Sequence, residues 1–211
     1  MYDTVIFDLD GTLLYTLEDL ADSVNHVLLE YGYPVHTYEE IRSYIGSGAK
    51  RLIEMSLPEG TCEQTITEAL QSFKKYYTAH SQIKTRPYPG IMDMLNNLKI
   101  RGVRMAIVSN KNAEAVRELQ KHYFEGLIEL AVGEGGSIKR KPDPSSILHV
   151  IEKFKSKKAL YVGDSLNDRL ASENAGIDCC LVTWGFGYDI ESLNPEYLAD
   201  TSQELERIIL G

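Results

Sequence analysis

The sequence predicts an α/β protein with a doubly wound, mainly parallel sheet and an inserted helical domain. Short apolar runs, which suit strands buried on both faces of a parallel sheet, occur at 4–7, 103–108, 127–132, 159–162 and 180–183. Helical patterns separate these runs, and this alternation is typical of a doubly wound sheet. The interval between the first two runs exceeds a βαβ unit by about 60 residues. We therefore expect an insertion after the first strand.

Local signals mark the ends of the predicted helices in the second half of the chain. Glycine, which favours helix C-termini, ends two patterns, and typical N-terminal residues begin two others. The signals are Gly102 after 89–101, Gly176 after 166–175, Asp143 followed by Pro144, and Thr201 with Glu204 in a capping box. A further helical pattern spans 113–122. These boundaries support the alternation of strands and helices.

The inserted segment is predicted to be helical. Helical patterns cover residues 17–30, the stretch around 49–56, and 61–81. The last pattern has apolar residues on one face at helical spacing, which indicates a stripe that faces a core. We expect a core domain formed by residues 1–14 and 88–211, and a helical cap domain formed by residues 15–87.

Charge and composition limit the classes of partner. The 211 residues include 22 lysines and arginines against 31 aspartates and glutamates, a net charge of -9, with the basic residues scattered. Nucleic-acid and anionic-membrane binders normally carry a basic stripe, so we expect neither partner. We find no apolar run near 18 residues and no signal peptide, and therefore expect a cytoplasmic protein. The three cysteines are predicted to be free thiols.

Chemically active side chains follow the predicted strands. In an open α/β sheet, ligands bind beyond the carboxyl ends of the strands. Asp8 and Asp10 follow the first strand, and residues two apart point to one side, while Gly11 lets the backbone turn. The later strands and the neighbouring loop supply Ser109, Asn110, Lys141, Asp164 and Asp168. The sequence therefore predicts a polar site at one edge of the sheet.

The four aspartates among these residues predict a metal site. Alone, each piece has an ordinary explanation as a turn, a loop or a helix N-cap. Four carboxylates that converge on one crevice would repel each other unless a cation lay among them. Oxygen ligands without histidine or thiolate favour Mg²⁺. We therefore expect Mg²⁺ as the cofactor.

The same residues, in this order and spacing, resemble the four motifs of the haloacid dehalogenase superfamily of phosphohydrolases. The motifs are Phe7-Asp8-Leu9-Asp10-Gly11-Thr12-Leu13, Ser109-Asn110, Lys141-Pro142, and Gly163-Asp164-Ser165 with Asp168. The resemblance covers essentially the whole chain, and it implies a Rossmann-like haloacid dehalogenase core with an α-helical cap inserted after the first motif.

The resemblance also implies a role for each motif residue. Asp8 would attack phosphorus and form an aspartyl phosphate, and Asp10 would act as general acid and then as general base. Mg²⁺ would be held by Asp8, the Asp10 carbonyl and Asp164, with Asp168 as a ligand or as a residue that orients the others. The transferring phosphoryl group would be bound by Ser109, Asn110, Lys141 and the amides of Gly11 and Thr12.

Weaker signals concern the subfamily. The segments 44–52 and 182–187 look most like phosphoglycolate phosphatases and their pyrophosphatase relatives. Within the first segment, Gly48, Lys50 and Arg51 are candidate substrate contacts of the cap, or belong to a turn between helices. The chain departs from the superfamily at Tyr15, where an acidic residue is common. Tyr15 either packs at the start of the cap or narrows the range of substrates.

We therefore expect a Mg²⁺-dependent phosphatase, monomeric or homodimeric, that acts on a small phosphorylated metabolite, with phosphoglycolate as the leading candidate. An inorganic pyrophosphatase and a phosphomutase of the β-phosphoglucomutase type would use the same core. A non-catalytic phosphate-binding module is disfavoured because each motif carboxylate is present. A haloalkanoate dehalogenase fits poorly, since it needs no Mg²⁺ and the chain keeps Asp10 and both acidic residues of the last motif.

Overall fold

The chain forms two compact units in a computed structural model that describes residues 1–136 and 138–211. The first unit contains Met1–Leu14 and Pro87–Gly211, and the second contains Tyr15–Arg86. The expected domain boundaries differ from these units by one residue, Pro87.

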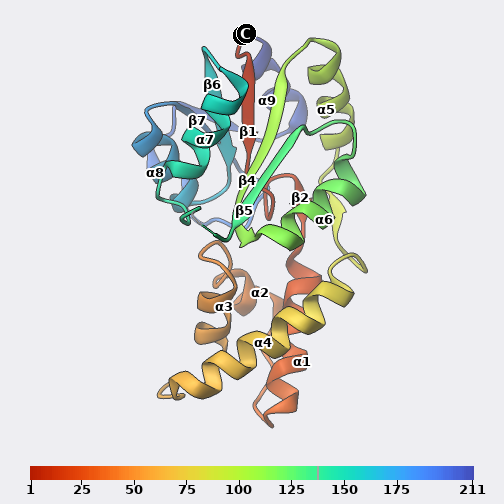
Figure 1. Cartoon of the computed structure of the whole chain (residues 1–211), viewed down its shortest axis with the longest axis vertical. Helices are drawn as coiled ribbons and strands as arrows, with labels where there is room; N and C mark the ends of the chain where they lie inside the picture. The colour runs from red at the N-terminus through yellow and green to blue at the C-terminus, as the bar shows by residue number, and fades with distance from the viewer. Residues whose placement is uncertain (137) are drawn as a thin grey trace. The chain divides into compact units, whose positions relative to one another are not determined.

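The first unit is built on a parallel six-stranded sheet, which confirms the predicted fold class (Figure 1). The strand order is β5-β4-β1-β6-β7-β8, and every neighbouring pair runs parallel. The bounds are Thr4–Phe7 (β1), Arg104–Asn112 (β4), Leu130–Glu134 (β5), Ala159–Gly163 (β6), Asp178–Val182 (β7) and Tyr197–Ala199 (β8). Phe7 lies opposite Ile107 of β4 and Val162 of β6. Strands β1 and β6 therefore end within one residue of each other, whereas β4 continues five residues beyond Ile107, to Asn112.

Helices cover both faces of this sheet, as a doubly wound fold requires (Figure 1). Successive strand residues point to opposite faces. Val5 and Phe7 of β1 pack in one apolar cluster with helices α5, α6 and α9, whereas Ile6 packs in another with α7 and α8. These helices are Ile91–Ile100 (α5), Ala113–Phe124 (α6), Ser145–Phe154 (α7), Leu166–Ala175 (α8) and Ser202–Leu210 (α9). The two-sided burial explains why the central strands are continuous apolar runs.

The observed helix ends refine two of the predicted caps. Helix α7 begins at Ser145, and the Asp143 carboxylate accepts a hydrogen bond from the Ser145 amide at 3.0 Å. Thr201 caps α9, as expected, by accepting from the amide of Glu204. The Glu204 carboxylate accepts from the amide of Asp200 rather than from that of Thr201, so the capping box is not formed as predicted.

The second unit is helical. Its helices are Leu17–Glu30 (α1), Tyr38–Arg42 (α2), Ala49–Ser56 (α3) and Glu63–His80 (α4). The Asp19 side chain of α1 is 3% exposed, and its carboxylate accepts hydrogen bonds from the amides of Ile83, Lys84 and Thr85. This contact ties the first helix to the segment that returns to the sheet. The two crossings of the chain form a small ribbon of β2 (Leu14–Tyr15) and β3 (Arg86–Pro87).

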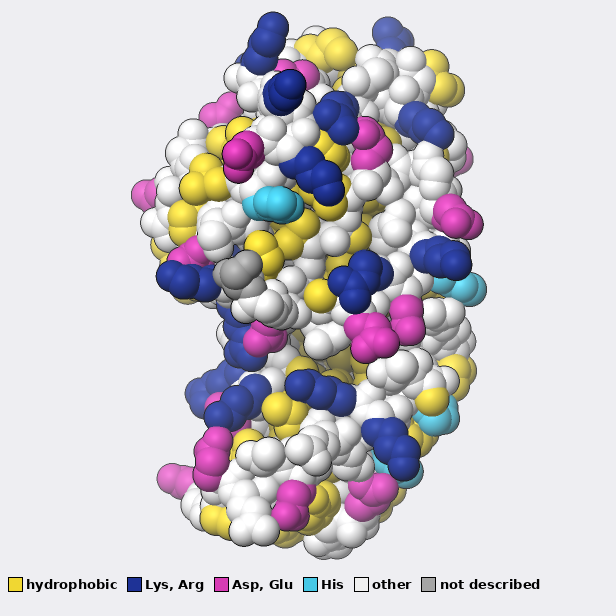
Figure 2. Space-filling view, in the orientation of Figure 1, with side chains coloured by type: hydrophobic (Ala, Val, Ile, Leu, Met, Phe, Trp, Pro, Cys, Tyr) yellow, Lys and Arg dark blue, Asp and Glu magenta, His cyan; other side chains and the backbone are white. Residues whose placement is uncertain are grey.

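The cysteines and the basic side chains are distributed as the sequence predicts. The cysteines are free, with Cys62 exposed and Cys179 and Cys180 buried, as predicted. Figure 2 shows lysine and arginine side chains interspersed with acidic ones on the face in view. No helix in the described part of the chain is both long and apolar enough to cross a bilayer.

Candidate active site

The candidate site lies at the carboxyl ends of the three central strands. Asp8 follows β1, Ser109 lies near the end of β4, and Asp164 follows β6. After β1, the chain forms β4 and β5 on one side of β1 and then crosses over to form β6 on the other side. A crevice forms where strand order reverses in this way, and ligands bind there in open α/β sheets.

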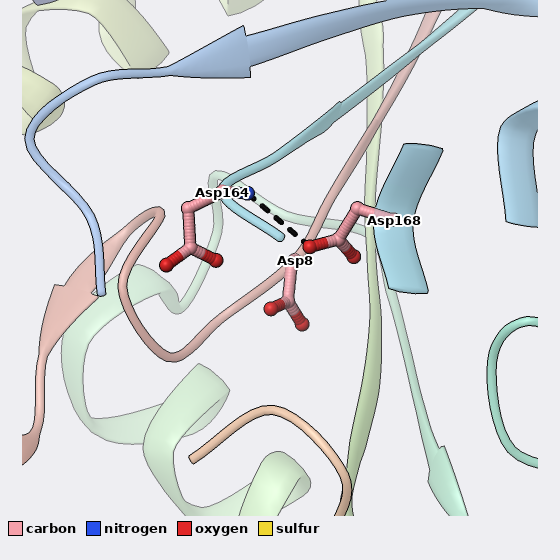
Figure 3. Close-up of side chains that lie close together, drawn as sticks. All are labelled: Asp8, Asp164 and Asp168. Atoms are coloured by element: carbon pink, nitrogen blue, oxygen red, sulfur yellow. Dashed lines mark hydrogen bonds between the residues drawn. The ribbon is translucent and has the colours of Figure 1, made fainter. Parts of the chain in front are cut away.

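Three carboxylates meet in this crevice. Asp8, Asp164 and Asp168 each offer an oxygen within 4.8 Å of the others, and all three residues are buried. In Figure 3 the Asp8 carboxylate lies between the other two, which come from the β6–α8 turn and from the first turn of α8. Asp168 is held in place because one oxygen accepts from the amides of Asp164 and Ser165 and from the Ser165 hydroxyl.

Lys141 places its ammonium group between two of these carboxylates. Its Nζ lies 2.8 Å from Asp8 Oδ1 and donates to Asp168 Oδ1 at 2.6 Å. It also donates to the hydroxyl of Tyr161 at 2.8 Å, and that hydroxyl lies 3.0 Å from Asp168 Oδ1. The Lys141 side chain is only 3% exposed. A buried ammonium with these partners is fixed in one position.

Burial and mutual repulsion change the protonation of the cluster. Burial raises the pKa of Asp8 to about 7, although Lys141 opposes the shift. Burial, together with the charges of Asp168 and Asp8, also raises the pKa of Asp164 well above its usual range. For Lys141, burial alone would lower the pKa, but Asp168 and Asp8 outweigh it and the pKa is raised. The lysine therefore stays charged.

Asp10 has a cation of its own. Lys111 Nζ donates to both carboxylate oxygens of Asp10 at 2.9 Å. The two side chains are 9% and 12% exposed, so water screens this ion pair little. Lys111 lies on β4 two residues beyond Ser109, and its amide donates to the Ser109 hydroxyl at 3.3 Å.

The loop after β7 encloses Asp164. The amide of Phe186 donates to Asp164 Oδ2 at 2.6 Å. A Cβ atom on Gly185 would lie 2.3 Å from Asp164 Cβ, and one on Gly187 would lie 1.9 Å from the Asp164 carbonyl oxygen. The two glycines therefore let the backbone approach this carboxylate closely.

The predicted phosphate-binding residues lie at the site, but two have other partners. The Gly11 amide donates to the carbonyl of Leu14 at 2.9 Å, so it closes a turn rather than offering a free donor. Gly11 is needed for its φ of +84°, and a Cβ there would lie 2.2 Å from Asp164 Oδ2. The Asn110 side chain bonds both the amide and the carbonyl of Lys141, and so positions that lysine. The Gly11 amide and the Asn110 side chain thus each have a hydrogen-bond partner within the protein.

Thr12 and Ser109 are buried beside the carboxylate cluster. The Thr12 hydroxyl lies 3.5 Å from Asp164 Oδ1, and the Thr12 carbonyl accepts from the indole of Trp184 at 3.1 Å. Ser109 is 7% exposed and keeps its hydroxyl at the end of β4. Both hydroxyls remain candidates for binding an anion.

The candidate cap residues pair within the helical unit. Lys50 Nζ lies 2.7 Å from Glu63 Oε1, and Arg51 Nη1 lies 3.4 Å from Glu54 Oε2. Gly48 precedes α3 with a φ of +84°. Tyr15 packs beneath Arg86, whose guanidinium carbon lies 4.6 Å from the centre of the ring. The Tyr15 ring therefore has a packing partner in Arg86, as one of its two interpretations expects.

Three residues at the site were not singled out from the sequence. Tyr161 belongs to a continuous apolar run and looked like an ordinary core residue. Lys111 directly follows Asn110 in the sequence, and its two-residue spacing from Ser109 is a signal that both side chains lie on one face of the strand. The amide of Phe186 could not be assigned from its side chain, yet the flanking glycines indicate a close backbone approach.

The cluster fits a hard divalent cation. Asp8 Oδ1 is buried and accepts no well-aligned hydrogen bond, although Lys141 is near. If all three carboxylates were ionised, they and the Lys141 ammonium would leave two uncompensated negative charges in a buried space, and the raised pKa values of Asp8 and Asp164 reflect this cost. A divalent cation would neutralise these charges, and carboxylate oxygens suit Mg²⁺. Among the described residues, Asp8, Asp164 and Asp168 are close enough together to hold such an ion.

The fold and this site together define an α/β protein with three buried carboxylates and a buried lysine at the carboxyl ends of its central strands. The chain belongs to the haloacid dehalogenase-like hydrolases, since the profile of that family matches residues 5–182. This family, and the similarity to phosphatases of known name, confirm the predicted enzyme class, a phosphoric monoester hydrolase.

Several proteins similar to this chain are phosphoglycolate phosphatases by name. The chain is 34% identical to the phosphoglycolate phosphatase of Psychrobacter arcticus, over 98% of this chain and 95% of that protein. It is 36% identical to phosphoglycolate phosphatase 1 of Pseudomonas aeruginosa, over 95% and 77%. One similar crystal structure is that of a predicted phosphoglycolate phosphatase from Lactobacillus delbrueckii subsp. bulgaricus. It superposes on this chain with a TM-score of 0.93. It is 33% identical and covers 100% of this chain and 99% of its own.

Proposed function

We propose that this chain is a Mg²⁺-dependent phosphatase that hydrolyses a small phosphomonoester through an aspartyl phosphate on Asp8. The observation that carries the proposal is the buried contact of Asp8 with Lys141, 2.8 Å apart, inside a cluster of three carboxylates. A carboxylate held beside a fixed cation can approach an anionic phosphoryl group, because the cation offsets the repulsion between the two anions.

Asp8 and Asp10 divide the chemistry into two displacements. An oxygen of Asp8 attacks phosphorus as the bond to the leaving oxygen breaks, and Asp10 gives a proton to that oxygen. A water molecule then attacks the aspartyl phosphate, and Asp10 takes its proton. The products are the alcohol and inorganic phosphate, and both aspartates return to their starting forms.

The other residues stabilise charge. Lys141 supports the phosphoryl oxygens, and Ser109 and Thr12 offer hydroxyl groups at the ends of two strands. Asp168 is saturated by contacts with five donors, so we assign it to orienting Lys141 rather than to binding metal. Bound by Asp8, Asp164 and the Asp10 carbonyl, Mg²⁺ would supply positive charge to the transferring phosphoryl group.

Phosphoglycolate is the proposed substrate. The support is the identity of 33–36% to proteins that carry this activity in their names, over nearly the whole chain. A phosphate-release screen over phosphoglycolate, pyrophosphate, sugar phosphates and nucleotides would test it. A preference for pyrophosphate, or interconversion of sugar phosphate isomers without net phosphate release, would contradict the proposal.

The decisive variant is Asp8→Asn, which keeps the shape of the side chain but removes the nucleophile. We expect phosphate release to fall by at least about a thousandfold, since loss of a covalent nucleophile has effects of this size. Wild-type turnover should require Mg²⁺ and stop in chelator. The exposed Asp93 of α5 provides a matched control, and Asp93→Asn should keep full turnover. Turnover that survives Asp8→Asn would refute the nucleophile assignment.

A further inference from the structure

Lys111 is a second lysine at the site, and neither the metal cluster nor the phosphoryl-binding group uses it. Its ammonium group contacts both oxygens of Asp10 at 2.9 Å, and its side chain is 9% exposed. The contact joins residues 101 positions apart in the sequence. The tertiary fold therefore brings this cation to the site.

The two lysines serve different carboxylates. Lys141 contacts Asp8 and Asp168, on the side of the proposed nucleophile and metal. Lys111 contacts Asp10, the proposed general acid, which must meet the oxygen of the leaving group. In the proposed mechanism Asp10 meets the oxygen of the leaving group, so the Lys111 ammonium, which contacts Asp10, would lie beside the organic part of the substrate.

We infer that Lys111 is a specificity-determining residue that binds a carboxylate on the leaving group of the substrate. This inference deepens the proposed function and rests on it. The substrates selected are phosphomonoesters with a second anionic group one or two carbons from the ester oxygen. Phosphoglycolate has this chemistry, whereas an uncharged alkyl phosphate does not.

An exchange of ion pairs makes this role compatible with catalysis. A lysine ammonium is a point charge on a flexible four-carbon stem, so it can change partner over a short distance. When an acidic substrate enters, the ammonium leaves one oxygen of Asp10 for the substrate carboxylate. The exchange keeps the buried ammonium paired, and it frees an Asp10 oxygen to carry a proton from solvent that then passes to the oxygen of the leaving group. A neutral leaving group offers no replacement partner, so Lys111 stays on Asp10.

The test compares phosphoglycolate with ethyl phosphate, which has a methyl group in place of the carboxylate. In Lys111→Met, the ratio of kcat/KM for phosphoglycolate to that for ethyl phosphate should fall about 10- to 100-fold, the size expected for one lost charge-assisted contact. Lys111→Arg keeps a cation and should keep most of the preference. Lys121 is an exposed lysine of α6, and Lys121→Met should leave the ratio unchanged.

A binding measurement separates this inference from the proposed function. In an Asp8→Asn background with Mg²⁺, calorimetry should show that Lys111→Met weakens binding of phosphoglycolate relative to ethyl phosphate. If both kcat/KM values fall equally, or if the binding preference survives, the inference is overturned and Lys111 only holds Asp10. If the wild type releases no phosphate from either compound, the proposed function fails, and the calorimetric preference alone decides the role of Lys111.

Discussion

Tyr161 links the buried cation of the site to the sheet. Its hydroxyl accepts from Lys141 Nζ at 2.8 Å and lies 3.1 Å from the carbonyl oxygen of Val108. Burial, with the nearby charges of Asp168 and Asp8, raises the pKa of this phenol well above its usual range. The hydroxyl thus stays protonated and keeps both contacts. Tyr161 acts through Lys141 and is a positioning residue.

Tyr161→Phe should therefore reduce turnover while the fold persists. The change leaves Lys141 without one of its three partners, so we expect a loss of about 1–2 kcal/mol in stability and roughly a tenfold lower kcat with little change in KM. Steady-state kinetics and urea unfolding give the two readouts. Tyr76→Phe, at a half-buried tyrosine of α4, serves as the control. Equal effects of the two variants on kcat would contradict this role.

At the scale of elements, the contact of α1 with the returning segment organises the helical unit. One buried carboxylate, that of Asp19, accepts three backbone amides from residues 83–85. Close by, Asp22 pairs with the Lys84 side chain at 2.7 Å, but both side chains are about 40% exposed. The two aspartates of the same helix therefore differ chiefly in burial.

Asp19→Ala should destabilise the protein by about 2–4 kcal/mol, because it leaves three amides without their acceptor. Asp22→Ala should cost less than about 1 kcal/mol, since exposed ion pairs contribute little. Denaturant unfolding measures both values. Hydrogen exchange of amides 83–85 should also accelerate in Asp19→Ala. If Asp19→Ala loses no more unfolding free energy than Asp22→Ala, the buried contact contributes little to stability.

For the whole molecule, the buried carboxylates make stability depend on pH and on metal. Burial raises the pKa of Asp8 to about 7, whereas a carboxyl group in the unfolded chain has a pKa of about 4. Between these values the folded state keeps a proton that the unfolded state has released. The free energy of unfolding therefore falls as pH rises through this window, and the stabilising contribution of the proton is lost above about pH 7.

The metal-free protein should therefore melt at a lower temperature at pH 8 than at pH 5.5. Asp8→Asn removes this titration and should raise the stability of the metal-free protein at pH 8, by on the order of 2–4 kcal/mol. Added Mg²⁺ should stabilise the wild type chiefly at pH 8, since it binds ionised carboxylates of the folded state. Thermal melts in chelator and in Mg²⁺ at both pH values check this. The same Mg²⁺ effect in Asp8→Asn would contradict it.

Local signals made much of the fold predictable. The patterns at residues 17–30, 49–56 and 166–175 coincide with α1, α3 and α8, and the run at 4–7 coincides with β1. Short elements were missed: β8 has three residues and exists through its pairing with β7, and α2 has five residues. The site carboxylates were found because they directly follow strands. Tyr161 was missed because its polar end cannot be distinguished within an apolar run.

The order of strands and helices, and the presence of carboxylates at strand ends, were determined by the sequence alone, because periodicity and capping are properties of neighbouring residues. The tertiary structure decided which lysine pairs with which carboxylate. Lys141 forms ion pairs with Asp8 and Asp168, and Lys111 forms one with Asp10. The tertiary structure also brought the Asn110 side chain into hydrogen bonds with the backbone of Lys141. These partners come from different strands and loops, so their distances depend on how the sheet brings distant segments together.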